Sequence, residues 1–476
     1  MKSPSKAPFK SRAVANYRRT TAFKFTCLFV ILAITLCTIQ VIILMRYEHP
    51  SDLEQEIAQT SSSNDDETLP KWITDYFRWH KDMRAKYPGT QLFLDPDAPK
   101  LIIRTCLGLC GGLNDRLGQL PWDLYLANQT QRILLLRWER PRPLENFLVP
   151  NDIDWSVPAH AEGFGDMKAV RAITPLFQDY ADDHPDDDFW ASHLDKALER
   201  ANTGEFKNVR VLRHRLLGHL AEDVLEERLR ALGETDMIHS TRSFGNIFRA
   251  FFKPSQGVNA QLQQVYSELN LSPGQYTAVH CRVRHPKATV AGVVVHGKFA
   301  KYPADKTGLP WYGETKDFAV AVATHAIQCA RTLSEDPKEP IYFMSDSNDL
   351  VRYIAHELND KDFISRNATL FDNKHDVAAL KAVKATNIVA REVTLENAHI
   401  DKQKGRKPKD YYATFADLLL AANARCVTFG IGFYAIFATK ISGTECKLLY
   451  QEEEWGGKEG GKESKVCTEE AYKHLP

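Results

Sequence analysis

Residues 101–138, LIIRTCLGLCGGLNDRLGQLPWDLYLANQTQRILLLRW, contain the pattern that decides the fold. Residues 101–106 and 133–138 are short apolar runs of the kind that form buried strands. Between them, a glycine-rich segment precedes a helix predicted over Arg116–Gln129, with Asn114 or Asp115 as its N-cap. Strand, glycine loop, helix and strand form a βαβ unit, which predicts a parallel sheet in an α/β domain.

The loop that contains Gly111, Gly112 and Asn114 has a second possible role besides its turn. A glycine loop that opens a helix presents free backbone N–H groups and the positive end of the helix dipole, and anions bind there. The chain contains neither G-x-G-x-x-G nor G-x-x-x-x-G-K-[ST]. The loop alone also fits a plain strand-to-helix turn, so its function depends on the rest of the chain.

The first 70 residues predict a membrane anchor and a stem. Residues 1–24 carry seven Lys and Arg residues and no acidic residue, and residues 25–45 carry no charge at all. A run of this length spans a bilayer as a helix, and its basic side stays cytosolic. We therefore expect a 1–24 cytosolic tail, a 25–45 type II signal-anchor and a polar 46–70 stem.

Composition excludes some functions and bounds the cysteine chemistry. Lys+Arg and Asp+Glu both total 61, so nothing in the overall charge suggests nucleic-acid binding. Seven of the nine cysteines follow the anchor, and this odd number leaves at least one thiol free or paired between chains. Cys426 and Cys446 bracket one segment and could pair. Three glycosylation sequons begin at Asn128, Asn270 and Asn367.

The rest of the chain alternates strands and helices and predicts a second α/β domain. Strands are expected over 276–284, 341–347 and 425–430, and helices over 316–332, 412–424 and 433–441. The turn Ser-Pro-Gly-Gln at 272–275 marks a boundary between two Rossmann-like, doubly wound domains, 71–274 and 275–450, which face a cleft. Residues 451–476 form a charged tail. Loops 150–190 and 285–313 would shape an acceptor site, and the basic loop 400–410 is either solvated or adds positive charge around an anionic ligand.

Three features are expected to meet at the carboxyl ends of the predicted strands. They are the Gly-Gly-Leu-Asn loop, the strand end that carries His280, Arg282 and Arg284, and the Phe-Gly-Ile-Gly turn at 429–432. Arginine, backbone N–H groups and a helix N-terminus all suit phosphate oxygens. No C-x-x-C pair or His-x-x-x-His motif occurs, so we predict no metal site. No G-x-S-x-G nucleophile elbow occurs either.

Taken in order, the motifs resemble those of a known family. GGLND before a helix, HCR at a strand end, SDS, and the block DLLL…CVTFGIGF are similar to the motifs of the GT-B fucosyltransferases, which include protein O-fucosyltransferases and α-1,6-fucosyltransferases. The resemblance spans about residues 98–450. It implies a GT-B-like fold and inverting transfer of fucose from GDP-fucose to a hydroxyl of a glycoprotein or glycan, with no cofactor and no essential metal. The anchor then places a lumenal catalytic domain in the Golgi or ER membrane.

The resemblance also implies roles for particular residues. Arg282 matches the family's His-x-Arg arginine, which stabilises charge on the leaving β-phosphate, and Asn114 matches the loop asparagine near the transferred sugar; these two are the predicted catalytic residues. Asp346 and Asp417 match acidic positions that act on ribose or guanine. The full predicted donor-binding set is Gly111, Gly112, Asn114, His280, Arg282, Asp346, Asp417, Thr428, Phe429, Gly430, Gly432 and Phe433.

The chain departs from the family pattern in three places. Val-Arg-His-Pro follows Arg282, so Arg284 is only a candidate partner, and Arg116 follows the loop asparagine by two residues instead of three. Some members have a Glu base where this chain has Gly111, so either His280 or His285 accepts the proton or the reaction is dissociative. Two alternatives remain open: a GT-B transferase for another sugar nucleotide, and a membrane-anchored pseudoenzyme that binds glycan or protein.

Overall fold

The computed structural model describes one compact unit of the chain, within Glu67–Pro476. The described residues are 69–106, 110–158, 170–172, 202, 207–214, 241–282, 316–334, 336–348, 350–351, 354, 387–391, 397–398, 400, 406–430, 432–450 and 467. The predicted anchor 25–45, nearly all of the stem and of the tail, the loop 285–313, Arg284, His285 and Asn367 lie outside these ranges.

The first sheet confirms the βαβ prediction. Its strands are β1 (Lys100–Cys106), β2 (Arg132–Trp138), β4 (Val170–Ala172) and β5 (Val211–His214), in the order β2-β1-β5-β4 with every pair parallel. Side chains of β1 alternate between two core clusters, with Ile102 on one side and Leu101 and Ile103 on the other. Both faces of this sheet are therefore buried, as in a doubly wound domain.

The helix predicted over residues 116–129 is wrong in its extent. The structure has two helices there, α5 (Leu113–Leu117) and α6 (Leu120–Gln129), and the N-cap of α5 is Gly112 instead of Asn114 or Asp115. Pro121 explains the break, because in one continuous helix its ring would clash with the Leu117 carbonyl. Proline is tolerated in the first turn, and there it lies at the start of α6.

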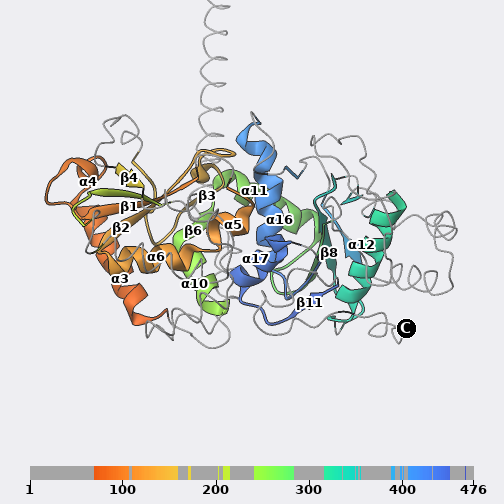
Figure 1. The fold of residues 1–476 in the computed structure, drawn as a ribbon. Coiled ribbons are helices and arrows are strands. Elements are labelled where there is room, and N and C mark those ends of the chain that lie inside the picture. The colour runs from red at the N-terminus through yellow and green to blue at the C-terminus, as the bar shows by residue number, and fades with distance from the viewer. Residues whose placement is uncertain are drawn as a thin grey trace, which may run out of the picture. The chain divides into compact units, whose positions relative to one another are not determined.

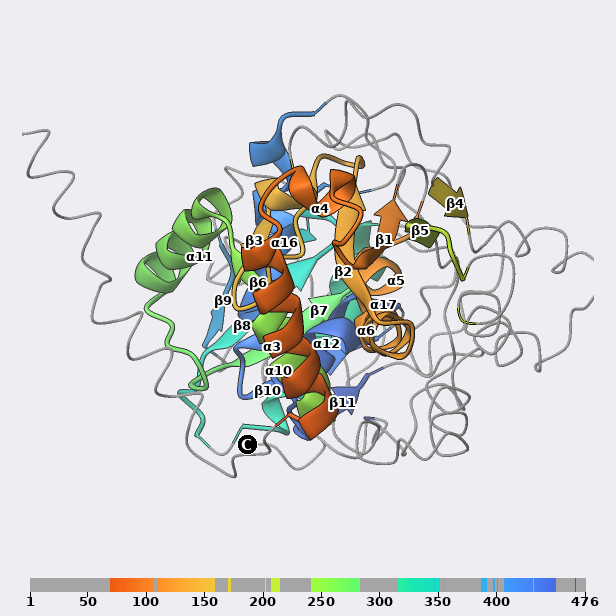
Figure 2. The ribbon, with the colours of Figure 1, turned by 90° about the vertical axis from the view of Figure 1, so that its left-hand side faces the viewer.

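The second sheet is also parallel and is covered on both faces. Its strands are β7 (Thr277–Cys281), β8 (Ile341–Ser345), β9 (Ile388–Val389), β10 (Cys426–Phe429) and β11 (Lys447–Leu449), in the order β11-β10-β7-β8-β9 (Figure 2). Helix α12 (Lys316–Arg331) packs on β7, β8 and β10 (Figure 1). Helix α16 (Tyr412–Ala422) contacts β7, and helix α17 (Phe433–Ser442) contacts β10. Alternate residues of β7 belong to different clusters, so both faces of this sheet are buried, and the predicted α/β class with parallel sheets is confirmed.

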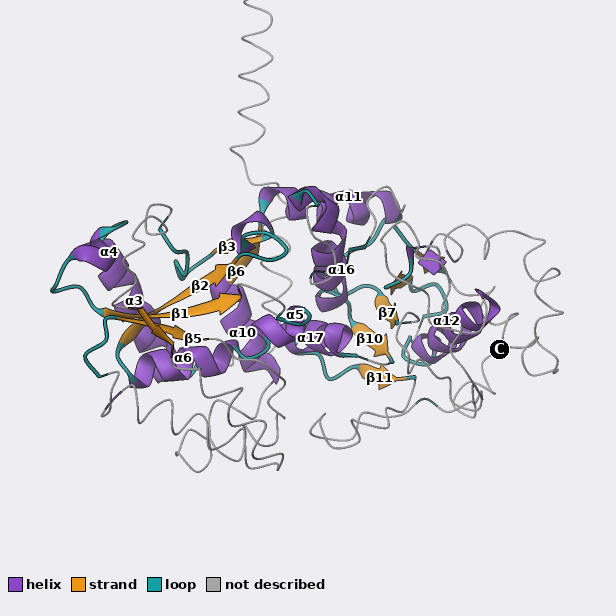
Figure 3. Ribbon diagram, turned by 45° about the horizontal axis from the view of Figure 1, so that its top comes forward, coloured by secondary structure: helices purple, strands orange, loops and turns teal. Residues whose placement is uncertain are grey.

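The remaining elements lie outside these two parallel sheets. They are α3 (Lys71–Lys86), α4 (Gln91–Leu94), η1 (Leu144–Asn146), β3 (Leu148–Pro150), α10 (Thr241–Phe251), β6 (Phe252–Pro254), α11 (Gln256–Leu269) and η5 (Pro408–Tyr411), with β3 and β6 antiparallel. Helices α10 and α11 precede the predicted boundary at 274, yet they pack on α17 and α16. Helix α5 also contacts α17 (Figure 3).

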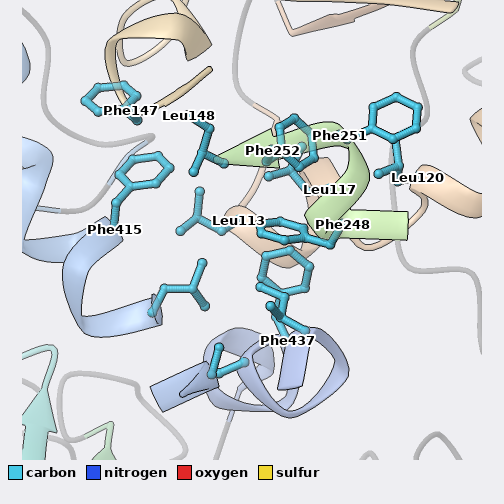
Figure 4. Packing of buried hydrophobic residues seen from close by; sticks show 14 of the residues in the cluster. Leu113, Leu117, Leu120, Phe147, Leu148, Phe248, Phe251, Phe252, Phe415 and Phe437 are labelled. Atoms are coloured by element: carbon cyan, nitrogen blue, oxygen red, sulfur yellow. The ribbon is translucent and has the colours of Figure 1, made fainter. Parts of the chain in front are cut away.

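One apolar cluster crosses the predicted domain boundary. The Phe147 and Phe415 rings stack with their centroids 4.4 Å apart, and Phe248 meets Phe437 edge-on at 5.9 Å (Figure 4). All four side chains are buried. This packing fixes α16 and α17, which precede and follow β10, against elements of the first half of the chain.

All seven cysteines after the anchor lie in the described ranges. They form the disulfides Cys106–Cys110, Cys329–Cys467 and Cys426–Cys446, which leaves the buried Cys281 as a free thiol. The predicted pairing of Cys426 with Cys446 is confirmed, and so is the expectation of one unpaired cysteine.

The structure does not show the predicted anchor. Of the helices in the described ranges, none is long and apolar enough to cross a membrane. Residues 25–45 are outside those ranges, so the type II topology remains a prediction from the sequence.

The stacked pair gives a test of the shared core. Phe147→Ala should lower the free energy of unfolding by about 3–5 kcal/mol, because it removes a fully buried aromatic side chain and leaves a cavity against Phe415. Denaturant unfolding followed by circular dichroism measures this loss. Leu94→Ala is the control, because Leu94 is 59% exposed. Equal effects of the two substitutions would contradict the packing described above.

Candidate active site

The glycine loop is held in its shape by a disulfide and by backbone geometry. The Cys106–Cys110 bridge joins the end of β1 to the residue before Gly111. Gly111 has a positive φ of 76°, and the backbone N–H of Gly112 donates to Asp115 Oδ2 at 2.5 Å. A Cβ on Gly111 would lie 2.0 Å from that same oxygen. Position 111 therefore accepts no side chain, which agrees with the lack of a family-type Glu there.

Asn114, the predicted catalytic asparagine, lies in the first turn of α5. Its side chain is 9% exposed, and its Oδ1 atom is buried without a hydrogen-bond partner among the described residues. Gly118 leaves room for it, since a Cβ there would lie 2.6 Å from Asn114 Oδ1. A buried acceptor without a partner costs free energy that a bound donor group would recover.

Arg116 fastens this loop to the chain after β2. Its Nε donates to the Gly111 carbonyl at 3.0 Å, its Nη1 donates to the Arg140 carbonyl, and its guanidinium lies 4.9 Å from the Trp138 ring centroid. Arg116 is 2% exposed. These contacts make it a positioning residue for the loop.

Arg282 and the start of α17 form the centre of the candidate site. Gly432 is the N-cap of α17 with φ of 93°, and a Cβ on it would lie 2.2 Å from Arg282 Nη1. The guanidinium therefore lies directly on the backbone where the helix begins. Both a guanidinium and a helix N-terminus attract anions, and here they occupy one place.

The turn before α17 contributes fewer candidate phosphate-binding N–H groups than the sequence predicted. Strand β10 is paired on both sides, with β7 and β11, so the N–H groups of Thr428 and Phe429 belong to the sheet. Phe429 is a core side chain, and Gly430 is required because a Cβ there would lie 2.5 Å from the Tyr450 ring. Gly432 and Phe433, at the start of α17, lie beyond Phe429, the last residue of β10. The Thr428 hydroxyl is buried without a partner among the described residues.

His280 lies in β7, two residues before Arg282, which directly follows the strand. Its ring packs on Tyr434 of α17 with the centroids 5.1 Å apart, and its Nδ1 is buried without a partner among the described residues. Burial, with a smaller effect of the nearby Arg282 charge, lowers the pKa of His280 to about 3. A neutral imidazole with this pKa binds protons too weakly to act as an efficient general base near neutral pH.

The two predicted acidic residues differ in their surroundings. Asp346 directly follows β8 and is half-buried, and the register pair Cys281↔Ser345 places it beside Arg282 at the carboxyl edge of the sheet. Asp417 is 2% exposed and accepts hydrogen bonds from Tyr342 at 2.6 Å and Arg391 Nε at 3.0 Å. Both oxygens of Asp417 have protein partners.

Asn397 connects these two acidic positions, and the sequence did not single it out. Its Nδ2 donates to Asp417 Oδ2 at 2.8 Å and to the Ser345 carbonyl at 3.0 Å. Asp417 therefore supports the chain end that carries Asp346, with Arg391 as its buried counter-ion at 2% exposure. No motif marks Arg391 or Asn397, which both follow the short strand β9 in the chain.

The structure thus brings part of the predicted donor-binding set together. His280, Arg282, Asp346, Gly432 and Phe433 lie around the carboxyl ends of β7, β8 and β10. Helix α5, which carries Asn114, contacts α17. Arg284 and His285 cannot be placed, since they are outside the described ranges. Within those ranges, no group of three or more His, Cys, Asp or Glu residues is arranged to hold a metal ion.

No family model and no curated protein matches the chain. Among solved structures, a mutant of Arabidopsis thaliana FUT1 in complex with GDP aligns at a TM-score of 0.44 and 12% identity, over 82% of each chain. NodZ α-1,6-fucosyltransferase soaked with GDP-fucose aligns at 0.36 and 13%, over 72% of this chain and 92% of that one.

A third match is POFUT1 in complex with GDP-fucose, at a TM-score of 0.37 and 12% identity, over 73% of this chain and 98% of that one. These three proteins are fucosyltransferases, the family that the sequence motifs resemble. At these identities and TM-scores the matches carry no argument of their own. The case for a function therefore rests on the residues of the site.

The low pKa of His280 predicts how stability depends on pH. The unfolded imidazole takes up a proton below pH 6.5, whereas the folded one stays neutral down to about pH 3, so stability falls as the pH drops from 6.5 to 3. The contribution of His280 to this fall is roughly 2 kcal/mol between pH 7 and pH 5. His280→Gln should reduce the fall in the free energy of unfolding between pH 7 and pH 5 by that amount. Urea unfolding at each pH measures this change.

His80 provides a matched variant away from the site. Burial lowers its pKa to about 4, and its Nε2–H donates to the Leu134 carbonyl on β2 at 3.1 Å. His80→Gln should flatten the stability curve to a similar degree. Curves that stay parallel to that of the unmodified protein in both variants would show that these imidazoles are charged in the folded state.

Proposed function

We propose that this chain is a glycosyltransferase that moves fucose from GDP-fucose to a hydroxyl of a glycan or glycoprotein, with inversion at the sugar carbon. The observation that carries the proposal is the contact of the Arg282 guanidinium with Gly432 at the start of α17. It places two anion-binding groups at the position where the motif resemblance puts the diphosphate of the donor.

The reaction would depend on charge stabilisation at this position. As the acceptor oxygen bonds to fucosyl C1, the bond from C1 to the phosphate oxygen breaks and its electron pair goes to the β-phosphate of GDP. Arg282 and the first amides of α17 are fixed before the reaction, so they stabilise this growing charge more in the transition state than in the ground state. Preorganised donors of this kind contribute about 3 kcal/mol each in other enzymes.

The neighbouring residues suit the rest of the donor. The unpaired Asn114 Oδ1 on α5 can accept a hydrogen bond from a sugar hydroxyl, and the loop Gly111–Gly112 allows close approach of the backbone. Asp346, at the end of β8, can accept hydrogen bonds from ribose hydroxyls or from the donor edge of guanine. Guanine offers two adjacent N–H donor groups, which a carboxylate binds well.

We further propose that the protein acts in the lumen of the Golgi or ER. This proposal rests on the sequence, in which the uncharged segment 25–45 follows a basic N-terminal stretch and precedes an acidic stretch. The three disulfides after the anchor are consistent with an oxidising compartment.

Calorimetric titration of the full chain in detergent tests the donor assignment. GDP and GDP-fucose should bind, whereas GDP-mannose should bind more weakly and UDP-sugars should not bind. Arg282→Ala should weaken GDP binding at least tenfold, since it removes a charge-assisted contact to the diphosphate. The control is Arg78→Ala, an exposed arginine on α3 that pairs with Asp75.

Each result separates the hypotheses. GDP-fucose binding that is lost in Arg282→Ala and kept in Arg78→Ala supports the proposal. Preference for a different sugar nucleotide would reassign the donor. GDP binding with no hydrolysis or transfer to glycoprotein or oligosaccharide acceptors would favour a pseudoenzyme, and no guanine-nucleotide binding at all would exclude the proposed site.

Gly432 allows a second test with a matched control. Gly432→Ala should weaken GDP binding about tenfold or more, because its Cβ would displace Arg282 Nη1 from 2.2 Å. Gly89→Ala has a similar backbone cost, since Gly89 also has a positive φ, of 58°, but nothing lies within 4 Å of its added Cβ. If both variants bind GDP equally well, GDP binding does not depend on the position of the Arg282 guanidinium against Gly432.

A further inference from the structure

The disulfide between Cys106 and Cys110 differs from the other two disulfides in how little chain it closes. Its cysteines are 4 positions apart, whereas those of the other two bridges are 138 and 20 positions apart. The restriction that a disulfide places on the unfolded chain grows with the length of the loop that it closes. The Cys106–Cys110 bridge therefore adds the least of the three to the stability of the fold, and its effect is mainly on local geometry.

This bridge connects the glycine loop to a fixed part of the first sheet. Cys106 is the last residue of β1 and is buried, and its carbonyl accepts a hydrogen bond from the Glu139 N–H at 2.9 Å. Cys110 directly precedes Gly111, whose positive φ belongs to the turn into α5. A covalent link from the sheet therefore ends one residue before the turn.

The hydrogen bonds of the loop described above come from side chains of α5. Asp115 accepts the Gly112 N–H, and Arg116 Nε donates to the Gly111 carbonyl at 3.0 Å. These bonds join the loop to the helix that follows it. The disulfide adds a covalent link to the strand that precedes it, and reduction removes that link.

The three disulfides also differ in their exposure. Cys110 is half-buried, whereas both cysteines of the Cys329–Cys467 bridge are buried. Reduction begins when a thiolate reaches one sulfur atom of the bridge, so access to that sulfur limits the rate. We therefore expect a small dithiol to open Cys106–Cys110, from the Cys110 side, before it opens Cys329–Cys467.

We propose that the Cys106–Cys110 disulfide positions the glycine loop for the donor sugar, and that its reduction by a dithiol weakens donor binding. A thiolate of the reductant bonds to Cys110 Sγ, and the electron pair of the S–S bond goes to Cys106 Sγ, which takes up a proton. The second thiol of the reductant then displaces Cys110 as a thiol. The bridge gains two electrons and two protons, and the dithiol becomes a disulfide. The inference rests on the proposed function, because it takes the glycine loop as part of the donor site.

The size of the effect follows from the freedom that reduction gives to the loop. Without the bridge, the backbone before Gly111 has more conformations, and donor binding must select one of them. Fixing the backbone of a single residue lowers an affinity about tenfold. The loop lies where the proposed site holds the sugar, and Arg282 lies where it holds the diphosphate. Reduction should therefore weaken GDP-fucose binding more than GDP binding.

Calorimetric titration of the full chain in detergent, before and after treatment with dithiothreitol, tests this inference. Alkylation of the new thiols and mass spectrometry show which bridge is open. When Cys106–Cys110 is open and Cys329–Cys467 is closed, GDP-fucose should bind about tenfold more weakly, and reoxidation should restore its affinity. The double variant Cys106→Ser/Cys110→Ser should show the same loss without reductant and should not respond to dithiothreitol.

The Cys426–Cys446 bridge provides the matched control. It also joins a buried cysteine to a half-buried one, and it links the start of β10 to the residue before β11. Cys426→Ser/Cys446→Ser should bind GDP-fucose like the unmodified protein and keep the response to dithiothreitol. In urea, its free energy of unfolding should fall further than that of the glycine-loop variant, because its bridge closes a longer loop.

Hydrogen exchange of the peptide that covers residues 110–118 separates this inference from the donor assignment. Reduction should speed exchange there in the absence of nucleotide. Unchanged exchange would overturn the inference, whatever the nucleotide result. Equal GDP-fucose affinity in both redox states would also overturn it, as would an equal loss of GDP and GDP-fucose binding. No guanine-nucleotide binding by the oxidised protein would instead reject the proposed function, while the exchange result would still show whether the disulfide holds the loop.

Discussion

The close approach of the Arg282 guanidinium to the backbone at Gly432 is the contact on which the site depends. It requires a residue without a side chain at 432, because any Cβ would lie 2.2 Å from Arg282 Nη1. It also requires parallel strands β7 and β10 to be adjacent, so that the residue after β7 meets the turn after β10. The sheet order therefore brings a side-chain cation and a helix N-terminus to one point, which neither element could do alone.

That contact would have no catalytic meaning without the part of the chain that precedes it. The glycine loop reaches α17 through α5, and α17 is held against the first half of the chain by the packing of Phe248 on Phe437. The Phe147–Phe415 stack does the same for α16. A shared core of this kind keeps the loop and Arg282 at a constant separation, which charge stabilisation in a transition state requires.

Local patterns in the sequence predicted most elements and the residues at strand ends, because strand periodicity and glycine turns act over a few residues. The break between α5 and α6 was missed, since the helical spacing of leucines outweighed Pro121. The roles of Arg391 and Asn397 could not be predicted, because their partners, such as Asp417, lie 20 or more positions away and no motif records the pairing. The hydrogen bonds from Arg142 to the Arg406 carbonyl were missed in the same way, because the two residues are 264 positions apart.

The surroundings of the loop also bear on how the proposed transfer proceeds. Position 111 has no space for a carboxylate base, and His280 is buried with a pKa lowered to about 3. Neither position 111 nor His280 therefore supplies a base for the proposed transfer. Such a site favours a transition state in which the bond to GDP is largely broken before the acceptor oxygen bonds to C1. The acceptor hydroxyl then loses its proton late, when it is already acidic, and needs little help from a base.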